Sequence, residues 1–166
     1  MDRNKRSAKM TAQRVERYPA VPSKAKNSLM ELWNKEYPKQ LSYPDLEHFD
    51  RYLNQLVSPS HYLIFEKSNS AIAWAFTFKR DGQIWFAIIV NSQYQKLGLG
   101  TSLLSAIKND NKEICGWVTD VSTYSKADGS PYKSPLSFYK KNGFKILPEV
   151  RLETDELTAV KIAYLR

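Results

Sequence analysis

The chain has 166 residues, of which 42% are hydrophobic and 13% are aromatic. This is the length of one ordinary globular domain, and the apolar content is too high for a disordered chain. The single cysteine, Cys115, excludes an internal disulfide framework and a metal site built from several thiolates of one chain. Two histidines, His48 and His61, disfavour a histidine-built metal centre, so we expect no metal cofactor.

Basic residues exceed acidic ones by 8, and the excess is concentrated near the N-terminal end. Residues 1–26 contain eight of the 25 Lys and Arg residues and two of the 17 acidic ones, a net charge of +6. This basic N-terminal segment is either an arm for nucleic acid or another polyanion, or a solvated, partly ordered terminus. We favour the terminus because aromatic residues are not interleaved with the charges, and we leave nucleic acid open as a partner.

No apolar run approaches the ~18 residues that a membrane-spanning helix needs, so we expect no membrane association. The first residues lack the apolar core of a secretory signal, which makes the cytoplasm the expected compartment. No repeat or low-complexity tract interrupts the body of the chain, and we expect residues 27–166 to form a single domain.

Two helices are expected first. In residues 28–37 apolar side chains recur every four residues, a helical period that Pro38 ends. A second helix over residues 43–57 starts at Ser42-Tyr43-Pro44-Asp45, a capping-box-like sequence with proline in the first turn. Its apolar face comprises Leu46, Phe49, Leu53 and Leu56.

Three strands follow, over residues 61–66, 72–78 and 84–90. The second alternates large and small apolar residues with a period of two, and the third is almost entirely apolar. Asp81-Gly82 between them predicts a tight hairpin turn, because both central residues of that turn need positive φ.

The remainder alternates helices and strands. We expect a helix over 101–109, a strand over 114–119 and a polar loop over 120–133. A short helix over 135–142 and strands over 144–147 and 158–165 complete the chain. Since strands 84–90 and 114–119 flank a helix, they are predicted to run parallel through a right-handed crossover. The result is an α/β fold with a mixed sheet and helices on both faces.

The most informative segment runs from the end of strand 84–90 into the next helix. Gly98 and Gly100 open that helix, and glycine there suggests close approach of a ligand to the backbone. A helix start presents unpaired N–H groups and a positive dipole end, which suits phosphate, and Lys96 adds positive charge. The alternative is a tight loop whose glycines only allow packing. The pattern matches neither a Walker loop nor a full dinucleotide-binding fingerprint.

Two motifs in this order resemble the GNAT acyltransferase superfamily. The first is Gln95-x-x-Gly98-x-Gly100 after a hydrophobic strand, and the second is the run from Phe138-Tyr139 to Gly143-Phe144. The resemblance covers roughly residues 28–165. It implies a GNAT-like fold whose central mixed sheet splays between strands 84–90 and 114–119.

The resemblance also implies how acetyl-CoA would bind as cosubstrate. The pantetheine arm would lie in the gap between the two strands, hydrogen-bonded to the main chain of Ile88, Ile89 and Val90, as in strand addition. An N–H near Val90 would polarise the thioester carbonyl. The pyrophosphate would sit on the main-chain N–H groups of Gln95, Lys96, Leu97, Gly98, Leu99, Gly100 and Thr101.

The same resemblance implies that Tyr139 hydrogen-bonds or protonates the sulfur as a general acid. The alternative role for Tyr139 is packing of helix 135–142. Asp120, at the end of strand 114–119, is the candidate proton acceptor, with Glu66 as runner-up, although either carboxylate is equally explained as solvated. Many family members carry an Asn in a short loop where this chain has the longer residues 120–134, so that contact is in doubt.

The predicted function is acetyl-CoA-dependent N-acylation of a primary amine, by direct transfer within a ternary complex. The acceptor is an unidentified small molecule or protein. The acids on helices 28–37 and 43–57 either favour a cationic acceptor or are the charges that exposed helices normally carry; they are Glu31, Glu36, Asp45, Glu47 and Asp50. The alternative is a non-catalytic module of the same fold that binds acyl-CoA or a polyanion through the basic segment. We leave homodimerisation open.

Overall fold

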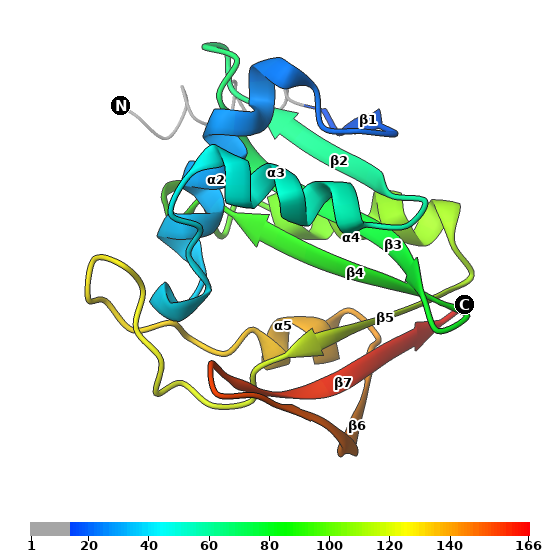
Figure 1. Ribbon diagram of the computed structural model, residues 1–166. Coiled ribbons are helices and arrows are strands. Elements are labelled where there is room, and N and C mark those ends of the chain that lie inside the picture. Colours follow the sequence, from blue (N-terminus) through cyan, green and yellow to red (C-terminus); the bar gives the residue numbers. More distant parts are fainter. Residues whose placement is uncertain (1–13) are drawn as a thin grey trace.

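The computed structural model describes residues 14–166, which form a single seven-stranded sheet flanked by helices (Figure 1). Its strands are β1 (Glu16–Tyr18), β2 (Ser60–Phe65), β3 (Ala71–Arg80), β4 (Gln83–Val90), β5 (Glu113–Val118), β6 (Lys145–Glu153) and β7 (Thr158–Leu165). Its α-helices are α2 (Lys26–Glu36), α3 (Leu46–Gln55), α4 (Leu99–Asp110) and α5 (Leu136–Lys141). Short 3-10 helices are η1 (Ser23–Ala25), η2 (Lys39–Leu41) and η3 (Ser92–Tyr94).

The strands lie in the order β1-β2-β3-β4-β5-β7-β6. All neighbouring pairs are antiparallel except β4 and β5, which are parallel and connected through α4. Asp81 and Gly82 both have positive φ, 53° and 73°, as the tight turn between β3 and β4 requires. The predicted mixed α/β sheet, the parallel pair and this hairpin are therefore confirmed.

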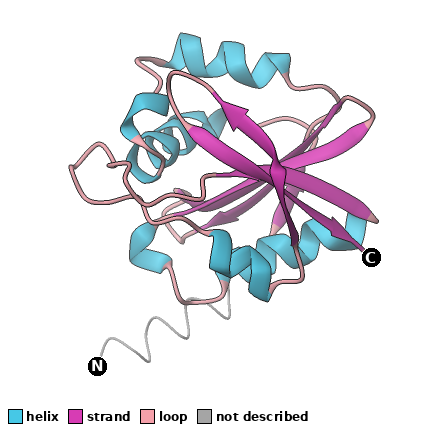
Figure 2. Ribbon diagram, turned by 90° about the horizontal axis from the view of Figure 1, so that it is seen from below, coloured by secondary structure: helices cyan, strands magenta, loops and turns pink. Residues whose placement is uncertain are grey.

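Helices lie on both faces of the sheet (Figure 2), and an apolar layer packs between helices and sheet on each face. On one face α2 and α3 pack against large strand side chains such as Trp74 and Phe76. On the other face α4 packs against β2, β3 and β4, and Tyr139 of α5 contacts Phe86 and Phe144 with ring centroids 5.6 and 5.3 Å apart. The alternation of apolar residues along β3 produces this arrangement, since successive side chains point to opposite faces.

Strands β4 and β5 touch at only one end. Their single register pair is Trp85↔Cys115. Just beyond it Gly116 lies so close to β4 that a Cβ atom there would be 3.1 Å from the Phe86 carbonyl oxygen. The two strands then diverge toward their carboxyl ends (Figure 1). The predicted splay is present, and a small residue in β5 lets the strands meet before they separate.

Three expectations for the elements need correction. Helix α3 begins after Asp45, whose side chain accepts the His48 N–H at 2.9 Å, so the cap lies three residues beyond Ser42. Strand β6 extends well past residue 147, because a register irregularity between Leu147 and Arg151 absorbs Pro148 and pairing with β7 resumes. Strand β1 was not expected, since three residues are too few to show a period.

The predicted basic N-terminal segment lies partly outside the described residues, which begin at 14. Within the described part, β1 pairs with β2, and Arg17 forms an ion pair with Asp110 at 3.4 Å. Among residues 14–166 no helix combines the length and apolar character needed to cross a bilayer.

His61 is a buried polar group within this core. Its Nδ1 accepts a hydrogen bond from Trp74 Nε1 at 3.1 Å, and burial lowers the pKa of His61 to about 4. Protonation would remove this acceptor and place a charge in the apolar layer. The neutral imidazole therefore stabilises the fold above the unfolded-state pKa near 6.5, and that contribution is lost as the pH falls toward 4.

We expect His61→Gln, which keeps an acceptor for Trp74 but does not titrate, to weaken the acid sensitivity of folding. The wild type should lose roughly 3 kcal/mol of unfolding free energy from this group between pH 6.5 and 4. Urea denaturation followed by tryptophan fluorescence over that range measures the difference. Parallel pH dependences for the two proteins would contradict the assignment.

Candidate functional site

The gap between β4 and β5 leaves main-chain groups of β4 without a neighbouring strand. Beyond Trp85 no residue of β4 pairs with β5 within the described chain. Ile89 faces the α2–α3 layer, whereas Ile88 and Val90 pack on the opposite layer. Their side chains are thus committed to packing, and only the main chain faces the gap. The Gln95 side chain donates to the Val90 carbonyl at 3.3 Å, which brings the first motif against this edge.

The loop after β4 turns sharply into α4. Lys96 and Gly98 have φ of 68° and 82°, and Gly98 is the N-cap residue. Within residues 14–166 no side chain caps the first amides of α4, and the one side-chain bond at this end runs from Ser102 Oγ to the Gly98 carbonyl at 3.0 Å. The amides of Leu99, Gly100 and Thr101 belong to the first turn, where an α-helix has no partners for them. Together with the dipole they form a site for an anion, next to the exposed Lys96.

The two glycines of the first motif have different roles. Gly98 needs its positive φ, and a Cβ atom there would meet nothing within 4 Å. At Gly100 a Cβ atom would lie 3.2 Å from Phe138 Cζ and 3.8 Å from Val90 Cγ2. Gly100 therefore allows close packing of α4 on α5 and β4, the alternative role that the sequence left open, and its main-chain N–H stays a predicted ligand group.

Tyr139 lies in α5, beneath the gap. Its ring packs edge-on against Phe86, Phe138 and Phe144, with centroids 5.1 to 5.6 Å apart. No group in residues 14–166 hydrogen-bonds to its hydroxyl. Burial raises the pKa of Tyr139 well above 10, so the hydroxyl stays protonated and is a donor at neutral pH. The second motif thus combines a packed ring with a hydroxyl that a ligand can use.

The two candidate proton acceptors both have partners. Asp120 accepts two hydrogen bonds from the Arg151 guanidinium, each 3.1 Å long, and these lower the pKa of Asp120. Glu66 accepts from the hydroxyls of Tyr94 and Ser68. A carboxylate held by a guanidinium is a weak base, which disfavours the role predicted for Asp120.

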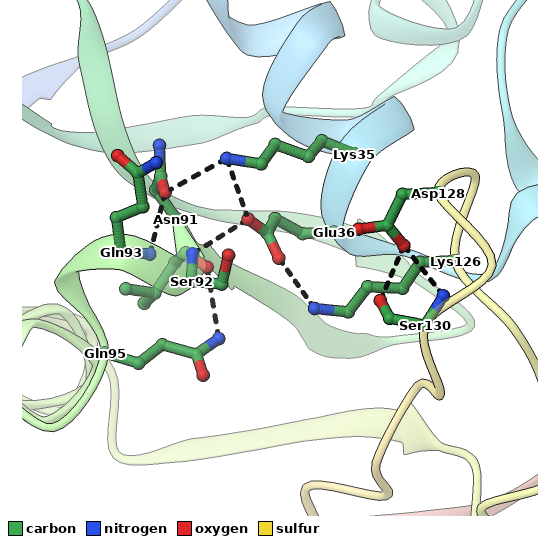
Figure 3. A network of polar contacts seen from close by, with 10 residues as sticks. Lys35, Glu36, Asn91, Ser92, Gln93, Gln95, Lys126, Asp128 and Ser130 are labelled. Atoms are coloured by element: carbon green, nitrogen blue, oxygen red, sulfur yellow. Dashed lines mark hydrogen bonds and ion pairs between the residues drawn. The ribbon is translucent and has the colours of Figure 1, made fainter.

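Glu36 is not singled out as a site residue by the sequence, because it is one of several acidic residues in the two predicted N-terminal helices. It is the last residue of α2 and only 4% exposed. Its Oε2 accepts the Ser92 N–H at 2.8 Å, just past the end of β4, and its Oε1 accepts from Lys126 Nζ at 2.9 Å (Figure 3). No sequence signal distinguishes Glu36 from its neighbours, since its burial depends on a loop ninety positions away.

The loop over residues 120–134 brings Lys126 to this carboxylate by crossing from β5 to α2. The Lys39 N–H donates to the Ser125 carbonyl at 2.9 Å, and the Tyr124 hydroxyl accepts the Thr158 N–H at 2.8 Å. At the start of the loop Thr119 Oγ1 is buried and has no hydrogen-bond partner among the described residues. The loop is therefore fixed at several points around a polar region beside the splayed strands.

The described residues contain no group of three or more His, Cys, Asp or Glu side chains that could hold a metal ion.

The fold is similar to several solved acetyltransferases. A structure of aminoglycoside 6'-N-acetyltransferase complexed with coenzyme A has a TM-score of 0.68 at 15% identity, covering 91% of this chain and 96% of that one. A phosphinothricin acetyltransferase from Sinorhizobium meliloti in complex with AcCoA has a TM-score of 0.64 at 10% identity, covering 91% and 88%. Spermidine/spermine N-acetyltransferase from Vibrio cholerae has a TM-score of 0.61 at 12% identity, covering 94% of each chain.

A comparison with curated proteins gave no match. At identities this low, the structural likeness establishes the fold alone. The family model of the acetyltransferase (GNAT) domain, however, matches residues 58–146, from the start of β2 to the second motif. That match spans more than half of the sequence and includes both motifs and the splayed strands, so the chain belongs to the GNAT acetyltransferase family.

Proposed function

We propose that the protein transfers an acetyl group from acetyl-CoA to a primary amine, with both substrates bound at once. The observation that carries the proposal is the open edge of β4 lying next to the uncapped start of α4. A coenzyme A molecule needs main-chain partners for its amide-containing arm and an anion site for its pyrophosphate. The edge of β4 supplies the main-chain partners and the start of α4, which follows β4 in the chain, supplies the anion site.

Cofactor binding would use main-chain groups almost exclusively. The amides and carbonyls of Ile88, Ile89 and Val90 would pair with the pantetheine arm, and the Gln95 side chain would release the Val90 carbonyl. The pyrophosphate would take the main-chain N–H groups of residues 95–101. Two solved acetyltransferases of the same fold are described in complex with coenzyme A or AcCoA, which supports the assignment.

The reaction would exchange the C–S bond of the thioester for an N–C bond and remove one proton from the amine. The neutral amine nitrogen attacks the thioester carbon, the N–C bond forms, and the C–S bond breaks to release the coenzyme A thiolate. A main-chain N–H near Val90 would stabilise the negative charge on the carbonyl oxygen. The Tyr139 hydroxyl would donate a hydrogen bond to the leaving sulfur, or its proton, in which case the phenolate regains a proton from solvent. The proton lost by the amine leaves to solvent or to a carboxylate.

Thiol release from acetyl-CoA, followed across a panel of primary amines, tests this function. Rapid release with at least one amine, together with mass-spectrometric detection of the acetylated product, is the expected result. Coenzyme A binding without amine-dependent release would favour the non-catalytic module. No binding of coenzyme A at millimolar concentration would contradict both.

The anion site makes a prediction at Thr101, which is exposed in the first turn of α4. Thr101→Glu places a negative charge at the N-terminal end of α4, where it interacts favourably with the helix dipole but repels a pyrophosphate. We expect the Kd for coenzyme A to rise at least about tenfold while the melting temperature is unchanged or higher. Isothermal titration calorimetry measures this, with the neutral Thr101→Gln as control. Equal affinities for the two variants would place the pyrophosphate elsewhere.

The role of Tyr139 makes a second prediction. Tyr139→Phe keeps the ring contacts with Phe86 and Phe144 and removes only the hydroxyl. We expect kcat to fall on the order of a hundredfold while the Kd for coenzyme A changes less than about twofold. Tyr164→Phe, the same chemical change at a ring that packs on Phe144, is the control. A matched loss of affinity and turnover would assign Tyr139 to binding or packing.

Asp120 as proton acceptor stays a prediction, and its pairing with Arg151 disfavours it. We expect Asp120→Asn to leave the acidic limb of the pH profile of kcat/KM in place, because the paired carboxylate contributes little as a base. The profile should be recorded with one active amine. A displaced limb, or a loss beyond about a hundredfold at neutral pH, would reinstate Asp120 as the base.

A further inference from the structure

Glu36 occupies a position that is unfavourable for an isolated carboxylate. It is buried, and it is the last residue of α2, where the helix dipole is negative. Both effects penalise a negative charge, so stability alone would favour a neutral or basic residue there. The carboxylate is compensated there by the Ser92 N–H on one oxygen and by a cation on the other.

Two cations approach this point, Lys126 from the loop over residues 120–134 and Lys35 from α2 itself. Lys126 Nζ lies 2.9 Å from one carboxylate oxygen, and Lys35 Nζ lies 4.0 Å from the other, which the Ser92 N–H also holds (Figure 3). Lys35 is half exposed and also contacts Asn91 at 3.5 Å. Lys126 is therefore the close ion-pair partner, and the carboxylate is fixed independently of it by a main-chain amide.

The Lys126 side chain can leave without unfolding its loop. Main-chain bonds close the turn around it, from the Lys126 N–H to the Ser130 carbonyl and from the Gly129 N–H to the Lys126 carbonyl. Asp128 adds two bonds to Ser130 at 2.6 and 2.9 Å. The ammonium is thus attached through a flexible four-carbon stem to a turn that holds itself together.

We propose that Glu36 binds a positively charged group of the acceptor, and that Lys126 takes the place of that group until the acceptor arrives. The inference rests on the proposed function. Exchange of one ammonium for another leaves no buried charge unpaired, so the exchange itself costs little. The carboxylate is hydrogen-bonded to Ser92, two residues past Val90, the last residue of β4. In the proposed function the thioester lies near Val90.

The charged group is a second cationic centre, separate from the amine that is acetylated. The reacting nitrogen has to be neutral when it attacks, so it cannot remain the partner of a buried carboxylate through the transfer. A second ammonium keeps its charge throughout and binds equally in the ground and transition states. Glu36 is therefore a specificity-determining residue whose contribution appears in KM rather than in kcat. Diamines and polyamines are the acceptor class that fits.

The exchange is tested without any acetyl transfer by chemical labelling of lysines. Protein loaded with coenzyme A is labelled with a limiting amine-reactive reagent, and the yield at Lys126 is divided by that at Lys133, an exposed lysine of the same loop. Linear diamines of three to six carbons should raise this ratio several-fold, whereas monoamines of the same length should not. An unchanged ratio across the whole diamine series overturns the proposal, even where acetylation of some amine is observed.

Kinetics with the same amines provide a second readout. Lys126→Met removes the competing ammonium, so KM for diamines should fall several-fold with kcat within about twofold, while Lys133→Met changes neither. Glu36→Gln keeps an acceptor for the Ser92 N–H and should abolish the preference for diamines over monoamines at an unchanged melting temperature. A rise in KM for Lys126→Met, or a retained diamine preference in Glu36→Gln, contradicts the proposal. Absence of any amine-dependent thiol release contradicts the proposed function instead, and the labelling result still stands by itself.

Discussion

The separation of β4 from β5 is the constraint on which the rest of the site depends. A parallel pair buried in a sheet normally exchanges hydrogen bonds along its whole length, because unpaired main-chain groups away from water are costly. Here the pair is reduced to Trp85↔Cys115, and α5 packs its aromatic rings against β4 on one side of the opening. The free edge is tolerated where a ligand or water can reach it, and we propose that it forms the cofactor site at the middle of the sheet.

The second constraint is the contact between α4 and its surroundings. Gly100 lets α4 approach Phe138 and Val90, so the helix start lies directly over the end of β4. Gly98 provides the left-handed turn that frees the first amides. The same short segment thus serves both the packing of α4 and the proposed anion site, because Gly100 lies against Phe138 and Val90 while Gly98 makes the turn before the first amides.

On the α2 side of the opening between β4 and β5, the contacts next to the end of β4 include polar ones. Glu36 and Lys126 form an ion pair that contributes little net stability compared with an apolar pair of the same volume, because both charges must be desolvated. Their value is positional: they connect the end of α2, the residue after β4 and the loop over residues 120–134. The loop over residues 120–134 is therefore part of the side on which we propose that the acceptor binds.

Local patterns in the sequence determined the order of elements, the β3–β4 turn at Asp81-Gly82, the helix start at Gly98 and the family, because each of these depends on residues close together in the chain. The length of β6 depended on pairing with β7, which continues past Pro148. The presence of β1 depended on pairing with β2, because three residues form a strand only beside a longer one. Only the tertiary structure decided that Gly100 serves packing, that Arg151 holds Asp120 and that Glu36 is buried against Lys126. These facts join residues tens of positions apart, and no periodicity or motif encodes the burial and charge pairing that such contacts create.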